Sequence, residues 1–328
     1  MSLSIKELSE KAGVSKSTVS KVMTGKDQHI SAKTREKILR IAQEFHYQAN
    51  PVAKSLKLKT SETIGLIIPD ISNPFFAQIS KGVHEIARLY NYGVFICNTD
   101  NETDEEIRSI QMLKAHMVSG IVMVVNETEA LKKETQQLFI PHVYVDRIPR
   151  WSIEQDCGAV YLDIFRAFYD ITKRFVEKKC THIGFIGVGK DNERYNGYRQ
   201  AIIGSKLKWD DRYCYEGKYD AETGYKGCEA LLQTNEIIDG FVCANDLIAI
   251  GAMHCLMDKK IKVPQDIKVT GFDDISLAEY TEPALTTYKQ NAVDEGRIAA
   301  TMVFEKILNN KEFERIEVSA ELKIRESL

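Results

Sequence analysis

The sequence has no long run of apolar residues and no regular cysteine pattern. No segment approaches the roughly 20 consecutive apolar residues that span a bilayer, and the polar start from Ser4 onward lacks the apolar stretch of a secretory signal. Its seven cysteines are odd in number and never stand at C-x-x-C spacing. We therefore expect reduced thiols that fill the core, a cytoplasmic location and no membrane contact.

Motifs for catalysis and metal binding are missing as well. The seven histidines form no ligand cluster, and neither H-E-x-x-H nor G-x-S-x-G occurs. Residues 184–190 match G-x-x-x-x-G-K, the start of a phosphate loop, but Asp191 follows where Ser or Thr would ligate Mg²⁺. A carboxylate there would also repel phosphate. The sequence thus predicts neither an enzyme nor a bound cofactor.

Charge is divided unevenly along the chain. The formal net charge is −3, yet residues 1–60 hold twelve Lys and Arg against five Asp and Glu, while the remainder holds 32 against 42. A basic segment on an acidic body predicts that this segment alone meets a polyanion. A solvated basic arm without a partner would give the same balance, so the charge alone does not identify a DNA-binding segment.

Three short helices are predicted within the first 48 residues. Ser4 and Glu7 stand at capping-box spacing, and Gly13 supplies a residue that turns readily at positive φ. Ser15 and Ser31 are good N-caps for a second and a third helix. Two helices joined by a tight glycine-containing turn, with a third in support, form a helix-turn-helix unit.

The second of these helices carries polar residues on its outer side. Lys16, Ser17 and Lys21 fall on one exposed face, which in a helix-turn-helix enters the major groove and reads base edges. A purely structural three-helix bundle would not explain this clustering. The candidate DNA-contacting residues of this segment are Ser15, Lys16, Ser17, Thr18 and Lys21.

Residues 50–57 predict one more short helix, begun by Asn50. It is far shorter than the roughly 12–15 residues that make an isolated helix marginal in water, so we expect it to be disordered unless contacts outside the segment stabilise it. Leu56 between Lys54 and Lys57 suits a minor-groove wedge, with leucine between base steps and lysines on phosphate. A plain interdomain linker is the alternative.

The rest of the chain alternates short apolar runs with amphipathic stretches. The runs have the length of buried strands and cover residues 64–69, 93–98, 120–125, 142–146, 182–188, 240–244 and 267–272. The intervening helices are predicted at residues 75–90, 104–117, 195–204, 223–232 and 247–259. Two rounds of this alternation predict an α/β core of two Rossmann-like lobes with parallel sheets, as in periplasmic binding proteins, and a cleft at their carboxyl edges.

Polar side chains gather directly after these predicted strands. The candidate effector-binding residues are Asp70, Asn73, Asp146, Arg147, Arg194, Asn245, Asp246 and Asp273, with Phe75, Phe76 and Tyr219 as aromatic neighbours. Carboxylates, amides and guanidinium groups suit a polyhydroxylated ligand, and aromatic rings cover the apolar face of a sugar. Helix capping explains Asn245 and Asp274 equally well.

Residues 12–22, AGVSKSTVSKV, closely resemble the helix-turn-helix signature of the lactose-repressor (LacI/GalR) family. The resemblance continues in order through residues 64–74, 98–100, 194–198, 244–246, 271–274 and 283–287. It implies a homodimer on a pseudo-palindromic operator, base reading by Lys16, Ser17 and Lys21, and a wedge at Leu56.

The same resemblance implies that Asp146, Arg194, Asn245 and Asp273 line an effector cleft. The sequence departs from the family pattern at Lys21, where Arg is usual, at residues 49–51, and at residues 163–164. Lys lacks the planar fork of Arg, which leaves its base preference open. No heptad tail follows Arg325, so a dimer rather than a tetramer is expected.

We therefore expect a helix-turn-helix domain at residues 1–48, a hinge at 49–60 and an effector-binding core at 61–328. The core would divide into an N-lobe of about 61–160 and 292–325 and a C-lobe of about 161–291. The predicted function is an allosteric repressor of carbohydrate-utilisation genes that responds to a sugar, sugar acid or sugar phosphate. Two alternatives remain at this point: control by a phosphorylated partner protein, and sugar binding without a regulatory role.

Overall fold

The computed structural model describes residues 3–23, 25, 27–47, 61–190, 192–234 and 237–328. The chain forms two compact units, one up to Glu62 and one from Thr63 to the end. None of the helices in the described part of the chain is long and apolar enough to cross a membrane.

In its described residues, the first unit contains the helices α1 (Ile5–Ala12), α2 (Lys16–Met23) and α3 (Ala32–Glu44), which pack against one another. The predicted capping box is confirmed, because the backbone N–H of Glu7 donates to Ser4 Oγ and Glu7 Oε2 accepts from Ser4 N–H. Gly13 ends α1 in the left-handed region at φ 68°, which glycine adopts at little cost. The core of this unit consists of Leu8, Ala12, Val19, Val22, Ile38, Ile41 and Ala42.

The second unit begins with a six-stranded parallel sheet in the order β11-β5-β4-β3-β1-β2. Its strands are β1 (Thr63–Ile68), β2 (Gly93–Asn98), β3 (Ile121–Met123), β4 (His142–Val145), β5 (Gly158–Tyr161) and β11 (Arg315–Glu317). One face packs against α5 (Pro74–Leu89) and α12 (Ala292–Asn309), and the other against α6 (Thr103–Ala115) and α7 (Glu129–Gln136). This sheet with its helices is the first lobe.

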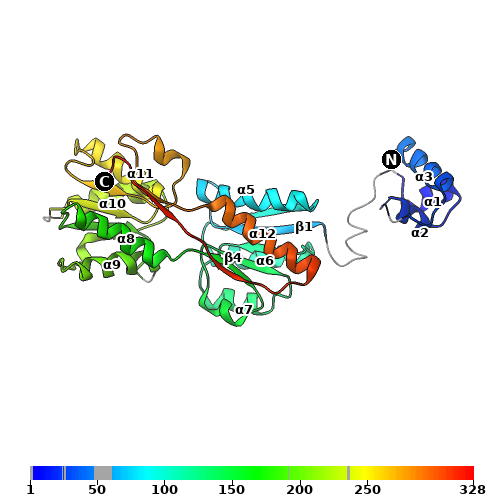
Figure 1. Cartoon of the computed structure of the whole chain (residues 1–328), viewed down its shortest axis with the longest axis horizontal. Coiled ribbons are helices and arrows are strands. Elements are labelled where there is room, and N and C mark those ends of the chain that lie inside the picture. The colour runs from blue at the N-terminus through cyan, green and yellow to red at the C-terminus, as the bar shows by residue number, and fades with distance from the viewer. Residues whose placement is uncertain (1–2, 24, 26, 48–60, 191, 235–236) are drawn as a thin grey trace. The chain divides into compact units, whose positions relative to one another are not determined.

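A second parallel sheet has the order β7-β6-β8-β9. Its strands are β6 (Ile183–Gly187), β7 (Cys214–Glu216), β8 (Gly240–Cys243) and β9 (Lys268–Thr270). The helices of this second lobe are α8 (Ile164–Glu177), α9 (Glu193–Gly204), α10 (Ala221–Leu232) and α11 (Asp246–Asp258). The α/β class with two parallel-sheet lobes predicted from the sequence is confirmed (Figure 1).

The chain passes between the lobes three times. It leaves the first sheet after β5, returns after β10 (Thr287–Lys289) to form α12 and β11, and crosses again to β12 (Glu321–Lys323). Figure 1 shows this last crossing as the red segment that ends on the second lobe. We expected the N-lobe to extend to residue 325, whereas β12 pairs antiparallel with β10, and the hydroxyl of Ser327 donates to the carbonyl oxygen of Val269 in β9.

Candidate functional sites

The second helix of the first unit has one buried and one exposed face. Val19 and Val22 pack into the core, while Lys16, Ser17 and Lys21 are exposed. The placement of these three side chains agrees with the face expected from the sequence. A short helix that shows cationic and hydroxyl groups on its outer side has the geometry of a groove-reading helix.

Ser15 holds the start of this helix. Its hydroxyl oxygen accepts from the backbone N–H of Thr18 at 3.1 Å, and it lies 2.7 Å from Ser17 Oγ and 2.9 Å from Thr18 Oγ1. The hydroxyl cluster thus caps α2 and fixes the first turn beside Lys16. The hinge residues expected to contact DNA (Asn50, Lys54, Leu56 and Lys57) lie outside the described residues and stay predictions.

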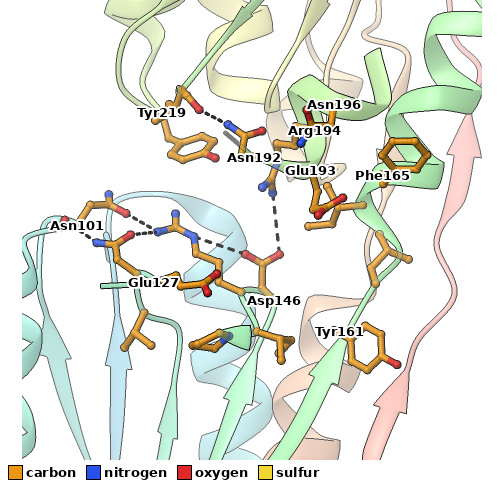
Figure 2. Close-up of a pocket in the computed structure, with 18 of the residues that line it drawn as sticks. Asn101, Glu127, Asp146, Tyr161, Phe165, Asn192, Glu193, Arg194, Asn196 and Tyr219 are labelled. Atoms are coloured by element: carbon orange, nitrogen blue, oxygen red, sulfur yellow. Dashed lines mark hydrogen bonds and ion pairs between the residues drawn. The ribbon is translucent and has the colours of Figure 1, made fainter. Parts of the chain in front are cut away.

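The second unit contains a pocket of about 920 Å³ lined by residues of both lobes. Its lining comes mainly from segments at or after the ends of strands of the first sheet (residues 100–102, 125–127, 146–150 and 161–165) and of the second (188, 192–194, 196 and 217–219). Figure 2 shows the side chains of both lobes pointing toward one another across this space. Ligand sites at the carboxyl edge are the rule for parallel sheets.

A smaller cavity, which we call the inner cavity, shares four residues with this pocket: Asp146, Arg147, Arg194 and Tyr219. The rest of its lining is Asn73, Phe75, Phe76, Asn245 and Asp273. Nine of the eleven effector-binding candidates from the sequence therefore line these two connected spaces. Segments more than a hundred residues apart in the chain supply them.

Two candidates lie elsewhere. Asp70 closes the turn between β1 and α5, where its Oδ1 accepts from Ser72 N–H at 2.8 Å and from the Ser72 hydroxyl at 2.7 Å. Asp246 is fully buried and accepts from the Thr287 hydroxyl at 2.5 Å and from Ile275 N–H at 2.8 Å. Neither lines either cavity. The carboxylate of Asp70 is occupied by a neighbouring serine, and that of Asp246 by donors distant in the sequence.

Arg194 and Asp146 face each other across the pocket from opposite lobes (Figure 2). Arg194 Nη2 lies 4.0 Å from Asp146 Oδ1. The Arg194 guanidinium also stands 5.5 Å from the ring centre of Tyr219 and 5.4 Å from that of Phe272. Both Arg194 Nε and Asp146 Oδ1 are buried without a hydrogen-bond partner among the described residues. Such atoms are costly unless a ligand satisfies them.

The electrostatics of this centre keep Arg194 cationic. Burial lowers the pKa of Arg194, but Tyr219, Asp146 and Asp273 together raise it above the usual value. Burial raises the pKa of Asp273 to about 7, Arg194 opposes that rise, and Asp146 adds to it. The backbone of Asp273 has φ 112°, a conformation that residues other than glycine rarely adopt. Such backbone strain clusters at binding sites.

Arg147 is held by two asparagines that our sequence reasoning missed. Its Nη1 donates to Asn101 Oδ1 at 2.7 Å and to Asn126 Oδ1 at 3.1 Å, and Figure 2 shows Asn101 on the first lobe. Behind it, the buried Glu106 accepts from Asn126 N–H at 2.9 Å. Asn126 directly follows the predicted strand 120–125, so the signal that identified Asp146 was also present there.

Glu295, in the first turn of α12, is a further residue missed from the sequence. Its side chain is 1% exposed, and burial raises the pKa of its carboxyl to about 8, with the charges of Asp146 and Asp273 adding to the rise. The negative charges of two side chains of the inner cavity thus act on Glu295, which itself lines neither cavity. A glutamate here interrupts the otherwise apolar inner face of α12.

These raised pKa values predict that stability falls as the pH rises. Asp273 and Glu295 bind their protons up to about 7 and about 8 in the folded chain, whereas unfolded carboxyls lose theirs at about 4. The free energy of unfolding should therefore fall by roughly 1 kcal/mol per pH unit for each such group between these values. Urea unfolding of Glu295→Gln between pH 5 and 8 should give a shallower fall than wild type.

The exposed Glu312, which follows α12, offers a matched control for that experiment. Glu312→Gln makes the same substitution at an exposed carboxyl and should leave the wild-type slope unchanged. Equal slopes for wild type and Glu295→Gln would show that Glu295 holds no proton in the folded state.

A basic helical unit on the same chain as two lobes around a polar pocket is the organisation expected of a regulator that binds DNA. Residues 4–50 match the family described as "Bacterial regulatory proteins, lacI family", and residues 172–328 match the "Periplasmic binding protein-like domain". Together with the relatives below, these matches establish that the chain belongs to the lacI family of bacterial regulatory proteins.

Two relatives and one solved structure illustrate the similarity. The HTH-type transcriptional regulator RegA of Clostridium saccharobutylicum is 34% identical over 96% of this chain and 95% of its own length. The ribose operon repressor of Halalkalibacterium halodurans is 32% identical over 98% of this chain and 96% of its own length. The lac repressor dimer bound to operator and an anti-inducer has a TM-score of 0.86 at 22% identity, covers 100% and 99% of the two chains, and shows the shared fold.

The relatives are transcription regulators, so this chain is a transcription regulator and not an enzyme. The resemblance recognised in the helix-turn-helix signature is thereby confirmed. A sugar-binding protein without a regulatory role, which the sequence alone had left open, does not agree with a lacI-family unit at residues 4–50.

Proposed function

We propose that the chain acts in the cytoplasm as a homodimeric repressor of carbohydrate-utilisation genes, with an operator affinity that a sugar-type effector changes. The observation that carries the proposal is the pair of unsatisfied, oppositely charged atoms, Arg194 Nε and Asp146 Oδ1, contributed to one pocket by two lobes. A polyhydroxylated ligand both donates and accepts hydrogen bonds, so it would satisfy both atoms at once.

The inner cavity holds only about 10 Å³, the space of one water, so its lining supports a sugar only as a wall beside the larger pocket. Phe75, Phe76 and Tyr219 offer ring surfaces, while Asn245 and Asp273 offer polar groups at the same place. This mixture of aromatic and polar groups suits a ring with one apolar face and a hydroxyl edge. The ribose operon repressor, a relative across nearly the whole chain, carries a sugar in its name.

The two lobes supply the means of regulation. A ligand that contacts Asp146 on one lobe and Arg194 on the other favours the arrangement of the lobes in which both contacts are made. Three chain crossings join the lobes, so a ligand that changes the angle between the lobes also moves the segments that connect them. By linkage, operator DNA then changes effector affinity by the same factor as effector changes operator affinity.

The decisive experiment is fluorescence anisotropy with the DNA upstream of the chain's own gene. Binding would be measured with and without a panel of sugars, sugar acids and sugar phosphates, and at several salt concentrations because phosphate contacts make affinity salt-dependent. Preference over random DNA, together with a shift caused by one compound, would support the proposal. Binding no tighter than to random DNA, with no response to any compound, would refute it for this operator.

Lys16→Ala should weaken operator binding by about tenfold or more, because a base-edge contact contributes roughly 1–3 kcal/mol. The side chain is exposed at the start of α2, so its removal leaves the core of the bundle untouched. Lys37→Ala, which removes the same charge from the exposed side of α3, is the matched control. Equal operator affinities for the two variants would remove α2 from the DNA-reading role.

A further inference from the structure

The pocket between the lobes is larger than one sugar ring needs. At about 30 Å³ for each water, its volume of about 920 Å³ would hold roughly thirty waters, whereas one hexose displaces roughly six. The lobes already meet inside the pocket, because Arg194 lies 4.0 Å from Asp146 and the guanidinium of Arg147 stands 5.3 Å from the ring centre of Tyr219. The volume is therefore not produced by lobes that stand apart.

The Arg194–Asp146 pair divides the pocket into two ends. Figure 2 shows Tyr219 on one side of this pair and Phe165 on the other. The end with Tyr219 adjoins the inner cavity, which this residue also lines. We call the opposite end the crossing subsite, and its lining consists of residues 161–165, Asn196 and Glu317.

Two of the connections between the lobes form the crossing subsite. Residues 161–165 carry the chain from β5 into α8, and Glu317 ends β11, directly before the last crossing. The two connections are joined at this point, since the backbone N–H of Val318 donates to the carbonyl oxygen of Tyr161 at 2.7 Å. A ligand at this end therefore contacts the segments that connect the lobes.

The crossing subsite combines aromatic rings with polar groups. Tyr161 and Phe165 are half-buried and line the pocket, and Asn196 adds an amide from the other lobe. The ring of Phe165 stacks on that of Tyr169 at 6.5 Å, which restricts its orientation. Rings beside amide and hydroxyl groups suit a sugar unit, which has an apolar face and a polar edge.

The charge of this end disfavours an anionic ligand. Seven residues that line the whole pocket are acidic and four are basic. At the crossing subsite and the adjoining start of α9, the acidic residues of the described lining are Asp163, Glu193 and Glu317, and Arg194, which already faces Asp146, is the one basic residue. An acidic lining lowers the local concentration of anions. A neutral unit therefore fits this end better than a sugar acid or a sugar phosphate.

We propose that the effector of this chain is a neutral oligosaccharide of two or more units, and that Tyr161, Phe165 and Asn196 of the crossing subsite bind its second unit. This inference rests on the proposed function and narrows the class of effector. The first unit lies against Tyr219 and the Arg194–Asp146 pair. Because the second unit contacts the connections between the lobes, a longer ligand restrains the angle between the lobes more than a single sugar does.

The test is isothermal titration calorimetry of the full chain with sugars of different length. Glucose, galactose, mannose and xylose are compared with cellobiose, maltose, lactose, mannobiose and xylobiose, with the corresponding trisaccharides, and with 6′-phosphates of the hexose disaccharides. We expect one of the longer neutral sugars to bind about tenfold or more tightly than its own monosaccharide, because a second ring adds its own stacking and hydrogen bonds. The phosphorylated form should bind more weakly than its neutral parent.

Two variants test the crossing subsite itself. Phe165→Ala and Asn196→Ala should each lower the ratio of oligosaccharide to monosaccharide affinity by about fivefold or more, because each removes a contact made by the second unit. Asn196→Ala leaves the packing of the aromatic ring intact, and thermal unfolding checks that both variants are folded. Phe139→Ala is the matched control, since Phe139 is 98% exposed and lines neither cavity. It should keep the wild-type ratio.

A monosaccharide that binds as tightly as every longer sugar would overturn the inference, as would tighter binding of a phosphorylated disaccharide than of its neutral parent, or binding by no sugar of the panel. An unchanged ratio in both folded variants would remove the crossing subsite. The proposed function is tested separately by anisotropy. A monosaccharide that shifts operator affinity more than any longer sugar leaves the function standing and removes the oligosaccharide, while an oligosaccharide that binds without shifting operator affinity supports the subsite and removes the function.

Discussion

Arg194→Met is expected to lower the affinity for effector by about a hundredfold or more, and with it the response of operator binding to effector. Arg194 is buried, pairs with Asp146 of the other lobe, and lowers the pKa of Asp273. Methionine keeps most of the apolar stem but leaves both carboxyls without this cation. Removing one partner of a buried ion pair costs about 3–5 kcal/mol, so the variant should also unfold at lower temperature.

Calorimetric titration of the variant with the effector measures the first effect, and thermal unfolding measures the second. Arg199→Met is the matched control, since Arg199 lies on the exposed side of the same helix, α9, over the ring of Trp209 at 5.5 Å. It should bind effector as the wild type does. A full response in Arg194→Met would mean that the effector binds outside the pocket described here.

Gly224→Ala should destabilise the second lobe by roughly 3 kcal/mol, because overfilling a close-packed contact forces backbone to move. A Cβ on Gly224 of α10 would lie 1.9 Å from the carbonyl oxygen of Ile248, and one on Gly251 of α11 would lie 1.9 Å from that of Ala221. The two glycines thus allow the backbones of α10 and α11 to touch. Urea unfolding of the full chain would measure the loss.

Gly204→Ala at the end of α9 provides the comparison. Its added Cβ would meet only the hydroxyl of Tyr169, at 3.4 Å, and alanine favours helix over glycine by about 0.5–1 kcal/mol. This variant should equal or exceed the wild type in stability. If both variants unfold at the same urea concentration, α10 and α11 tolerate a separation that the close contact does not suggest.

The sequence predicts the fold well where the signal is local. The capping box of Ser4 and Glu7, the left-handed turn at Gly13 and the buried run of β1 need only neighbours a few residues away. The alternation of strands and helices also fixes where side chains such as Asp146 and Asn245 emerge, because the carboxyl ends of parallel strands share one edge. The cleft could therefore be anticipated before its shape was known.

What escaped prediction depends on contacts between distant segments. Asp246 follows a strand just as Asp146 does, but Thr287 and Ile275, far along the chain, supply the donors that bury its carboxylate. Glu295 shows no motif at all, and only the packing of α12 against the first sheet buries it. The final crossing to β12 could not be predicted from local sequence either, since this strand has only three residues and two of them are charged.

The threefold crossing between lobes has a consequence for biosynthesis. On the ribosome, β1 to β5 emerge first, but α12 and β11, which cover and extend that sheet, emerge only after the second lobe. Until then the face that will meet Ala299, Val303 and Phe304, all fully buried in the finished chain, stays open. The nascent first lobe is therefore a partly assembled intermediate with exposed apolar surface, of the kind that chaperones recognise. A chain released before residue 292 would lack the helix that covers this surface.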